Sequence, residues 1–392
     1  MAKSGIIEYP ICIWGKNMRW IASAAFGLEG LVKRDLERLD AGGIRTLPTG
    51  GVTFEGDGAT GFRANLWLRT ADRVLLEMGR FEAKSFEALF EGVKALPWPD
   101  FLPRDAAFPV RAQCARSQLM SPRDCQAITK KAIVERLKGA YRVDWLPETG
   151  TAYAIDVSIH EDQVVVALDS SGAALSRRGY RTWNGEAPLR ETLAASLAFL
   201  SPWRPSMPLL DPCCGTGTIL IESAMIALDR APGLTRAFDC EAWAFMPKGA
   251  MKEIRDEAIG RFEAAKSRPL DIRGSDIDPE ALKLAERHVA QAGLAGRIRL
   301  EQADLRDVAV GEGFGAIIVN PPYGERLGDR RAAQAVAKAL GDLERRSGWS
   351  LSALTADRGF ERAFGRRGDK RRRLYNGRIE CEFITFAGGH AK

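Results

Sequence analysis

Residues 208–224 read PLLDPCCGTGTILIESA, and this stretch decides the fold. Its first three residues have the apolar character of a short strand, and a glycine-rich turn follows from Asp211 to Thr218. A helical pattern then runs from Ile219 to Leu228. This order of strand, turn and helix brings backbone amides close to a ligand. Taken alone, a single G-x-G turn is a weak signal, because a tight turn that binds nothing looks the same.

Strand-like and helical patterns continue to alternate around and after this turn. We expect strands at Pro208–Leu210, Ile272–Ser275, Ile298–Glu301, Ala316–Val319 and Ser350–Leu354. The helical patterns between most of them predict a mainly parallel α/β sheet with helices on both faces.

The end of the chain has a different pattern. Asn376-Gly377 separates two strand patterns, Arg373–Tyr375 and Ile379–Phe386. An Asn-Gly pair between two strands is the strongest short hairpin signal. The parallel sheet is therefore expected to close with an antiparallel hairpin.

The first third of the chain has the patterns of two smaller α+β units. The first unit combines strands expected at Arg19–Ala25 and Val52–Phe54 with a helix at Leu28–Leu39. Gly42-Gly43 is interpreted as a break between these elements.

The second unit combines three expected strands with one long basic helix. Ser121 is expected to cap this helix and Pro122 to take its first position, and the helix should run to about Lys138. The strands are expected at Ala107–Ala112, Ala152–Ile159 and Val164–Leu168.

Three aspartates follow strands of the expected parallel sheet. Asp276 lies at a strand end, where a carboxylate can accept hydrogen bonds from both hydroxyls of a ribose. Asp278 precedes Pro279 and is instead expected to cap the next helix. Asp304 ends another strand pattern and can accept a bond from an adenine amino group. A dinucleotide fingerprint would place its acid about 20 residues after the glycines, and Asp276 lies far beyond that.

The most specific signal is Asn320-Pro321-Pro322-Tyr323, directly after the strand Ala316–Val319. Two prolines remove two backbone donors and fix the loop. The Asn320 side-chain oxygen and the Pro321 carbonyl remain as acceptors, and Tyr323 offers an aromatic face. Two acceptors beside a stacking ring suit the exocyclic amino group of a nucleobase. We therefore expect these four residues to form a catalytic loop.

With these two loops, the sequence resembles a known family. Asp211–Glu222 and Asn320–Leu327 look like the cofactor and catalytic loops of class I methyltransferases. More narrowly, they are similar to those of THUMP-domain RNA methyltransferases related to the 23S ribosomal RNA guanine-N2 enzymes. Arg178–Arg181, Ala187–Ala194 and Tyr375–Cys381 support the resemblance, which covers nearly the whole chain. There is one methyltransferase domain, unlike the longer fused members of the family.

The resemblance implies a domain order and a cofactor. A ferredoxin-like α+β domain at residues 1–65 and a THUMP RNA-binding domain at 66–175 would precede a Rossmann-like class I methyltransferase domain at 186–392. The implied cofactor is S-adenosylmethionine. The implied partner is RNA, either 23S ribosomal RNA or a ribosomal assembly intermediate.

The resemblance also implies roles for individual residues. The methionine part would be held by Asp211 and the glycine turn, the ribose by Asp276, the adenine by Asp304 and the target base by the loop from Asn320 to Tyr323. The implied cofactor-binding set is Asp211, Cys213, Gly215, Thr216, Gly217, Asp276, Ile277, Asp304 and Asn320. Thr216 stands where the family often has serine, so a hydroxyl is kept.

Basic residues gather in three zones of a chain whose net charge is only +6. The zones are residues 130–138, 177–181 and 366–373, and together they favour a polyanionic partner. RNA contacts are expected from Lys130, Lys131, Lys138, Arg177, Arg178 and Arg371.

Other functional classes find little support. The seven cysteines lack C-x-x-C spacing and the three histidines are far apart, so we expect reduced thiols and no metal site. Neither a signal peptide nor an apolar run of bilayer length is visible. The protein is expected in the cytoplasm, away from membranes, and no obligate protein partner is evident.

Three other functions use some of the same sequence features. An adenine-N6 methyltransferase acting on DNA or RNA remains open, because the Asn-Pro-Pro-Tyr loop serves either amino group. A catalytically silent RNA-binding protein would keep the fold, although intact Asp276, Asp304 and Asn320 argue against it. A Rossmann oxidoreductase is least supported, given the spacing from glycine to acid and the Pro-Pro loop.

Overall fold

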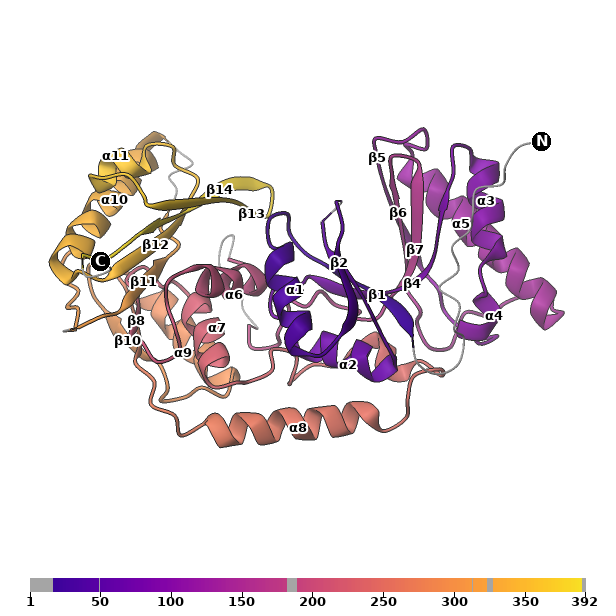
Figure 1. Cartoon of the computed structure of the whole chain (residues 1–392), viewed down its shortest axis with the longest axis horizontal. Helices are drawn as coiled ribbons and strands as arrows, with labels where there is room; N and C mark the ends of the chain where they lie inside the picture. Colours follow the sequence, from indigo (N-terminus) through magenta and orange to yellow (C-terminus); the bar gives the residue numbers. More distant parts are fainter. Residues whose placement is uncertain (1–16, 49, 182–188, 312, 323–326, 390–392) are drawn as a thin grey trace. The chain divides into compact units, whose positions relative to one another are not determined.

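The structure, a computed structural model, describes residues 17–389 apart from 49, 182–188, 312 and 323–326. Two compact units are built from interleaved segments of the chain (Figure 1). Unit 1 takes Met1–Ala24, Val32–Leu175 and Ala237–Arg255. Unit 2 takes Ala25–Leu31, Ser176–Arg236 and Asp256–Lys392.

Unit 1 contains a seven-stranded sheet in the order β2-β3-β1-β4-β7-β6-β5. Neighbouring strands are antiparallel except for the parallel pair β5 and β6. The central strand β4 pairs with β1 on one side and β7 on the other, so the two expected α+β units share one sheet. The strands are β1 (Met18–Ser23), β2 (Gly42–Thr46), β3 (Val52–Gly56), β4 (Arg73–Glu82), β5 (Val110–Ala115), β6 (Ile155–His160) and β7 (Gln163–Asp169).

Two local expectations in this unit need correction. Gly42-Gly43 does not break the chain but begins strand β2. Strand β4 was not expected at all, although it is ten residues long. Its side chains are buried at most successive positions, so it lacks the alternation that marks a half-buried strand.

Three helices of unit 1, α2, α3 and α5, begin with a side-chain cap. Ser121 accepts a hydrogen bond from the backbone N–H of Asp124 at 3.3 Å, which confirms the expected start of α5. The helix ends three residues later than expected, where Arg142 adopts a left-handed conformation. The helices are α2 (Gly58–Trp67), α3 (Phe86–Ala95), α4 (Trp98–Phe101) and α5 (Pro122–Tyr141), with a short 3₁₀ turn at Asp239–Ala242, together with α1 (Glu29–Arg38), whose residues are divided between the units.

Unit 2 contains the expected mainly parallel sheet, in the order β10-β9-β8-β11-β12-β14-β13. The first five strands are parallel, and β14 is antiparallel to both β12 and β13, which confirms the terminal hairpin. The strands are β8 (Leu209–Asp211), β9 (Ile272–Asp276), β10 (Arg299–Gln302), β11 (Ala316–Val319), β12 (Ser350–Thr355), β13 (Lys370–Asn376) and β14 (Ile379–Phe386).

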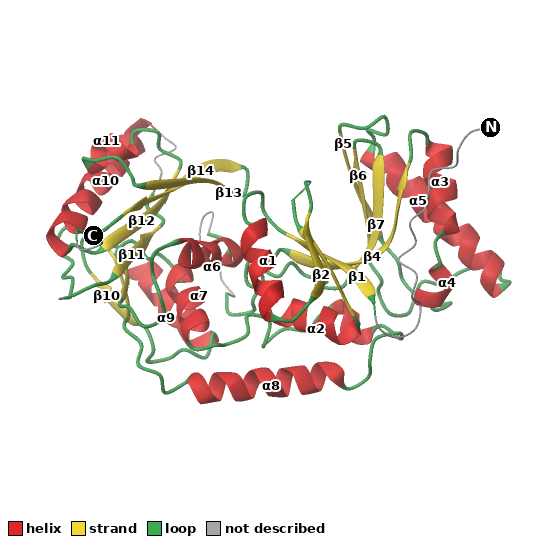
Figure 2. Cartoon of the chain, in the orientation of Figure 1, coloured by secondary structure: helices red, strands yellow, loops and turns green. Residues whose placement is uncertain are grey.

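Both faces of this sheet are buried, which explains the continuous apolar runs in its central strands. Successive residues point to opposite faces: Leu209 and Ile318 join one core cluster, while Leu210 and Ile317 join the other. Figure 2 shows the helices around the strands. They are α6 (Glu191–Leu200), α7 (Thr218–Ala227), α9 (Pro279–Gln291), α10 (Leu327–Ser347) and α11 (Phe360–Phe364), together with α8 (Ala250–Ala265), whose residues are divided between the units.

The strand order places a reversal beside β8. From β8 the chain continues to β9 on one side, and it later reaches β11 on the other. In open α/β sheets such a point opens a crevice at the carboxyl ends of the strands. Among the helices that the structure describes, none is long and apolar enough to cross a bilayer.

Candidate functional site

The expected site residues meet at one edge of the unit 2 sheet. Asp211 and Asp276 end β8 and β9, while Asp304 and Asn320 follow β10 and β11. Because these four strands are parallel neighbours, their carboxyl ends share an edge. A cavity of about 550 Å³ opens here. Of the residues expected from the sequence, Cys213, Asp276, Ile277, Asp304 and Pro322 line it.

The glycine turn and Asp276 form one hydrogen-bonded unit. Gly215 and Gly217 have φ values of +52° and +79°, a conformation that favours glycine. The Gly215 N–H donates to Asp276 Oδ2 at 2.7 Å, and the Asp278 N–H donates to Oδ1 at 3.0 Å. Each carboxylate oxygen keeps a second lone pair. Asp276 can therefore also accept bonds from two ligand hydroxyls.

Asp278 has the separate role expected for it. Its carboxylate accepts a hydrogen bond from the Glu280 N–H at 2.9 Å and caps α9. Pro279 occupies the first turn of this helix, as expected. Asp276 therefore lines the cavity, whereas Asp278 caps the start of α9.

Asp211 lies buried beneath the turn, with 1% of its surface exposed. Burial raises the pKa of Asp211 to about 8, the hydrogen bond from the Cys213 N–H opposes that rise, and the charge of Asp276 adds to it. A carboxyl group with a raised pKa beside a cavity is typical of a functional site. A cationic ligand group close to Asp211 would favour its ionised form.

The thiols of the turn are unreactive. Burial raises the pKa of both Cys213 and Cys214 well above the ordinary range, and the charge of Asp211 adds to the effect. Only a thiolate is an effective nucleophile. At neutral pH both groups are therefore protonated thiols, which are poor nucleophiles.

Asp304 has a partner that the sequence did not suggest. Arg306 holds the carboxylate in a fork, with Nε 2.9 Å from Oδ1 and Nη2 2.5 Å from Oδ2. The side-chain bonds from Arg306 and the bond from its backbone N–H lower the pKa of Asp304. Both residues line the cavity. Asp304 is therefore ionised and held in one orientation.

The catalytic loop follows β11 directly. Asn320 is half-buried, Pro321 is buried, and Pro322 is exposed at the cavity. Tyr323, the fourth residue expected in this loop, lies outside the described residues.

One wall of the cavity was missed in the sequence. Ala332, Ala335, Val336 and Ala339 of α10 line it. Their spacing of three, four and seven residues puts them on one helix face. Small side chains on this face leave room for a ligand. The run Ala332 to Ala339 carries this signal in the sequence, but alanine is equally common as a plain helix former.

A buried polar network lies behind the turn. His288 is buried, and its Nδ1 lies 3.3 Å from the Thr216 carbonyl oxygen. Burial lowers the pKa of His288, although the bond to Thr216 opposes this. Arg181 donates to the hydroxyl of Thr218 at 2.6 Å, at the first residue of α7. These contacts hold the turn and the helix start together.

Two of the expected RNA contacts are structural instead. Arg178 is buried, and its Nε lies 3.4 Å from Glu222 Oε1. The same carboxylate accepts a hydrogen bond from the Tyr180 hydroxyl. Lys130 donates to the Phe108 carbonyl at 3.0 Å and to Glu148 at 2.5 Å. Their charges are already compensated within the fold, so we withdraw both from the RNA surface.

The other expected RNA contacts differ in availability. Lys131 and Arg177 are exposed, and Lys138 is half-exposed. Arg371 is exposed but forms a fork with Glu361, with Nη2 2.7 Å and 2.9 Å from the two carboxylate oxygens. Arg371 is therefore the least available of these four for a phosphate.

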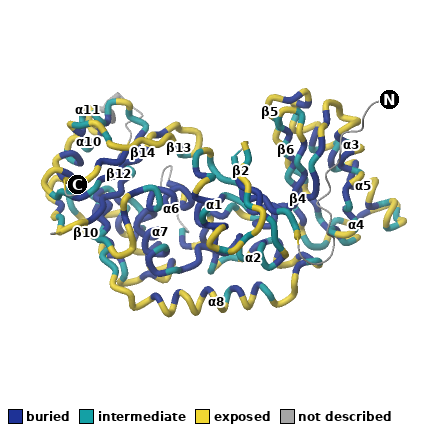
Figure 3. The backbone as a smooth tube through the Cα atoms, viewed as in Figure 1, coloured by how far each residue is buried: buried dark blue, intermediate teal, exposed yellow. Residues whose placement is uncertain are grey.

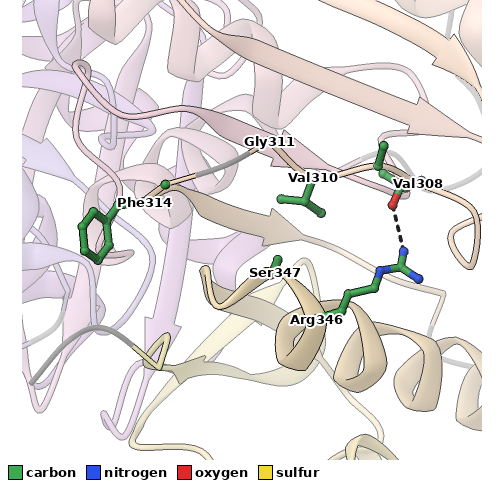
Figure 4. Close-up of a pocket in the computed structure, with 8 residues that line it drawn as sticks. Val308, Val310, Gly311, Phe314, Arg346 and Ser347 are labelled. Atoms are coloured by element: carbon green, nitrogen blue, oxygen red, sulfur yellow. Dashed lines mark hydrogen bonds between the residues drawn. The ribbon is translucent and has the colours of Figure 1, made fainter.

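A second hollow of about 550 Å³ lies away from this edge (Figure 4). Phe314, Arg346 and Ser347 line it, and Arg346 donates to the Val308 carbonyl at 2.8 Å. Phe314 precedes β11, whereas Asn320 follows it. The hollow therefore lies at the amino end of the strand, opposite the converging aspartates, and it is not the candidate site.

Three segments of the chain match known domains. Residues 178–384 match the methyltransferase domain of the RMKL-like family. Residues 83–169 match the THUMP domain, and residues 19–75 match the RlmL ferredoxin-like domain.

Two curated relatives cover nearly the whole chain. A Bacillus subtilis protein named as a candidate RNA methyltransferase, YpsC, is 41% identical over 95% of this chain and 96% of its own length. The ribosomal RNA large subunit methyltransferase K/L of Methylococcus capsulatus is 37% identical over 94% of this chain. The chain spans 51% of that longer relative.

Two crystal structures have the same fold over nearly the full length. A Listeria monocytogenes protein, described as a predicted N6-adenine-specific DNA methylase, is 42% identical with a TM-score of 0.90, covering 95% of this chain and 97% of its own. SMU.472, a candidate methyltransferase complexed with SAH, is 38% identical with a TM-score of 0.90, covering 97% of this chain and 100% of its own.

Proposed function

Because the chain belongs to the family of RMKL-like methyltransferases, with ferredoxin-like and THUMP domains ahead of the methyltransferase domain, we propose that it methylates the N2 amino group of a guanine in 23S ribosomal RNA. The chain is an RNA methyltransferase that uses S-adenosylmethionine. The convergence of Asp211, Asp276, Asp304 and Asn320 on one edge of the sheet supports the methyl transfer in this proposal.

The residues present fit this cofactor. Gly215 and Gly217 allow the backbone to approach a ligand. Asp276 keeps free lone pairs for ribose hydroxyls, and Asp304 offers a fixed carboxylate to an adenine amino group. Asp211 is buried and protonated at neutral pH, and the methionine ammonium group beside it would favour its ionised form. A cavity of about 550 Å³ falls within the range of small-molecule sites.

The cofactor, when bound, supplies a methyl group on a sulfonium, which is a strong electrophile. The amino group of a base is a poor nucleophile, because its lone pair is delocalised into the ring. The protein's task is to position that nitrogen and to accept hydrogen bonds from its N–H groups. We assign this task to the Asn320 side-chain oxygen and the Pro321 carbonyl, with Tyr323 stacking on a base taken out of its helix.

The substrate assignment rests on the relatives as well as on the site. The methyltransferase K/L relative is named for the RNA of the large ribosomal subunit, and the THUMP domain supports an RNA partner. We propose 23S ribosomal RNA or an assembly intermediate that contains it. Such a substrate also supports a cytoplasmic location.

The nucleoside product tests this proposal. Large-subunit RNA from cells that lack the gene is methylated by the purified protein with labelled cofactor, then digested and analysed by mass spectrometry. We expect N2-methylguanosine. N6-methyladenosine would instead establish the adenine-N6 alternative, which the same loop can serve. A product methylated on carbon or ribose would reject both assignments of the loop.

A further inference from the structure

We propose that the β13–β14 hairpin of unit 2 binds the RNA backbone beside the target nucleotide. This inference rests on the proposed function for its substrate but on separate observations for its location. Residues 370–386 carry five basic and two acidic side chains. The basic run was visible in the sequence, but its position relative to the catalytic edge was not.

The register of the sheet places this hairpin close to the catalytic loop. Val319 of β11 pairs with Ala353, Ala353 pairs with Ile384, and Ile384 pairs with Arg371. Neighbouring strands lie about 4.8 Å apart. The three spacings put the backbone of Arg371 about 14 Å from that of Val319, the residue before Asn320.

The hairpin also projects past the sheet on the catalytic side. Strand β13 runs parallel to β12, since both are antiparallel to β14. The last residue of β12, Thr355, pairs with Glu382, which pairs with Arg373. Residues 374–381, including the turn, therefore extend beyond the end of β12, as Figure 1 shows. They extend in the same direction as the strand end that carries Asn320.

The basic side chains of this hairpin are exposed, as the colouring of β13 in Figure 3 shows. Arg373 lies 3.4 Å from Glu380, but both side chains are more than half exposed, and such a pair is weak. Arg372 uses one nitrogen to donate to the Gly27 carbonyl at 3.1 Å, which leaves its other donors. Arg378 is exposed at the turn. Guanidinium groups bind phosphate oxygens well.

An edge strand has a second reason to carry charge. β13 is the last strand of the sheet, and charged side chains on an edge prevent pairing with other chains. Either sign of charge achieves this, whereas a phosphate backbone requires positive charge. The two explanations therefore differ in what charge reversal does.

The test uses the full-length protein and a transcript of unmodified large-subunit ribosomal RNA. Arg372, Arg373 and Arg378 are replaced together by glutamine in one variant and by glutamate in another. A third variant changes only Arg373 and Arg378 to glutamine, which keeps the bond from Arg372 to Gly27. A matched control replaces three exposed basic residues of α9 and β10, Lys283, Arg287 and Arg299, by glutamine. RNA affinity is measured at several salt concentrations, with the melting temperature and cofactor affinity of every variant.

We expect the triple glutamine variant to bind RNA at least tenfold more weakly in 0.1 M salt. The slope of log affinity against log salt should fall by about 2, since each lost phosphate contact removes about 0.7–0.9. The glutamate variant should bind RNA more weakly still and keep the oligomeric state of the wild type. The RNA affinity of the third variant should lie between those of the wild type and the triple glutamine variant. The RNA affinity of the control should differ from that of the wild type by less than about threefold, because few phosphate contacts are lost. Cofactor affinity should be the same in all variants.

If the folded glutamine and glutamate variants bind RNA as tightly as the wild type, the inference is overturned. Protection of the sheet edge would then remain as the role of these arginines. An equal loss of affinity in the control would also overturn it, since charge anywhere on unit 2 would then suffice. These results are separable from the nucleoside analysis: an unexpected product rejects the proposed function, whereas an unaffected salt slope rejects only the hairpin.

Discussion

Asp211 is a carboxyl group that folding removes almost completely from water. Burial raises its pKa to about 8, against about 3.9 in an unfolded chain. Between these two values the unfolded chain has released the proton while the folded protein retains it. Its contribution to stability is therefore complete below about pH 4 and is lost as the pH rises through about 8.

Replacing Asp211 by asparagine should remove this pH dependence. Asparagine keeps an acceptor for the Cys213 N–H but cannot ionise. The free energy of unfolding of D211N, relative to the wild type, should rise between pH 5 and pH 8.5. Urea unfolding of the cofactor-free proteins at several pH values measures this. A difference that is constant with pH would contradict the raised pKa.

Asp276 and Asp278 offer a matched pair for testing the cofactor site. Asp276→Ala should weaken binding of S-adenosylmethionine about tenfold to a hundredfold, because charge-assisted hydrogen bonds contribute about 1.5–3 kcal/mol. Asp278→Ala should leave that affinity nearly unchanged and cost about 1 kcal/mol of stability through the lost helix cap. Calorimetric titration and urea unfolding distinguish the two. Equal losses of affinity would mean that Asp276 has no special role.

Asn320 tests the chemistry rather than the binding of the cofactor. Asn320→Ala removes an acceptor for the amino hydrogens of the base, so turnover should fall by at least about a hundredfold, the scale of one lost transition-state contact. Cofactor affinity should stay nearly unchanged. Single-turnover methylation and calorimetry give the two values. Retained turnover would assign the acceptor role elsewhere in the loop.

At the scale of elements, α5 carries basic residues that differ in whether their side chains are bound within the fold or accessible to a ligand. Lys130 is bound to Phe108 and Glu148 within unit 1, whereas Lys131 is exposed and Lys138 is half-exposed. All three looked alike in the sequence. The helix therefore has a structural basic residue beside residues that are available to RNA.

This division gives a prediction for the helix. Changing Lys131 and Lys138 together to alanine should weaken RNA binding and lower its salt dependence by about 1–2 units of slope, with little change in melting temperature. Lys130→Ala should lower the melting temperature and leave the salt slope unchanged. Filter binding at several salt concentrations and calorimetric melting measure both. A lower slope for Lys130→Ala would restore that residue to the RNA surface.

At the scale of the whole molecule, the two units exchange segments of chain. Leu28 and Leu31 are buried in the same core cluster as Leu193 and Leu197 of unit 2. In the other direction, residues 237–255 belong to unit 1, where Trp243 stacks on Tyr153 with ring centroids 5.5 Å apart. Cutting the chain between the expected domains therefore damages both cores.

We accordingly expect a fragment of residues 176–392 to be less stable than unit 2 in the full chain. It lacks Leu28 and Leu31, and loss of a buried leucine side chain costs about 2–5 kcal/mol. Its Trp243 also loses the Tyr153 ring. Scanning calorimetry should give a lower melting temperature than the full-length protein with Leu28→Ala alone. A fragment as stable as the intact protein would show that these contacts add little.

Local chemistry explains what the sequence alone determined. The glycine turn, the caps at Ser121 and Asp278 and the hairpin at Asn376-Gly377 depend on backbone conformation within a few residues. The strand ends that carry Asp276 and Asn320 follow from hydrophobic periodicity and from the shared edge of parallel strands. The cavity edge was therefore predictable before any tertiary contact was known.

Tertiary structure alone decided which charges and surfaces are available. Arg178 and Arg177 are neighbours in sequence, yet one is buried against Glu222 and the other is exposed. Tertiary structure also decided that α10 forms one wall of the cavity. It likewise decided that β4 joins the strands of the two N-terminal units into one sheet. Each of these depends on partners far away along the chain, because burial and pairing are set by which elements the topology brings together.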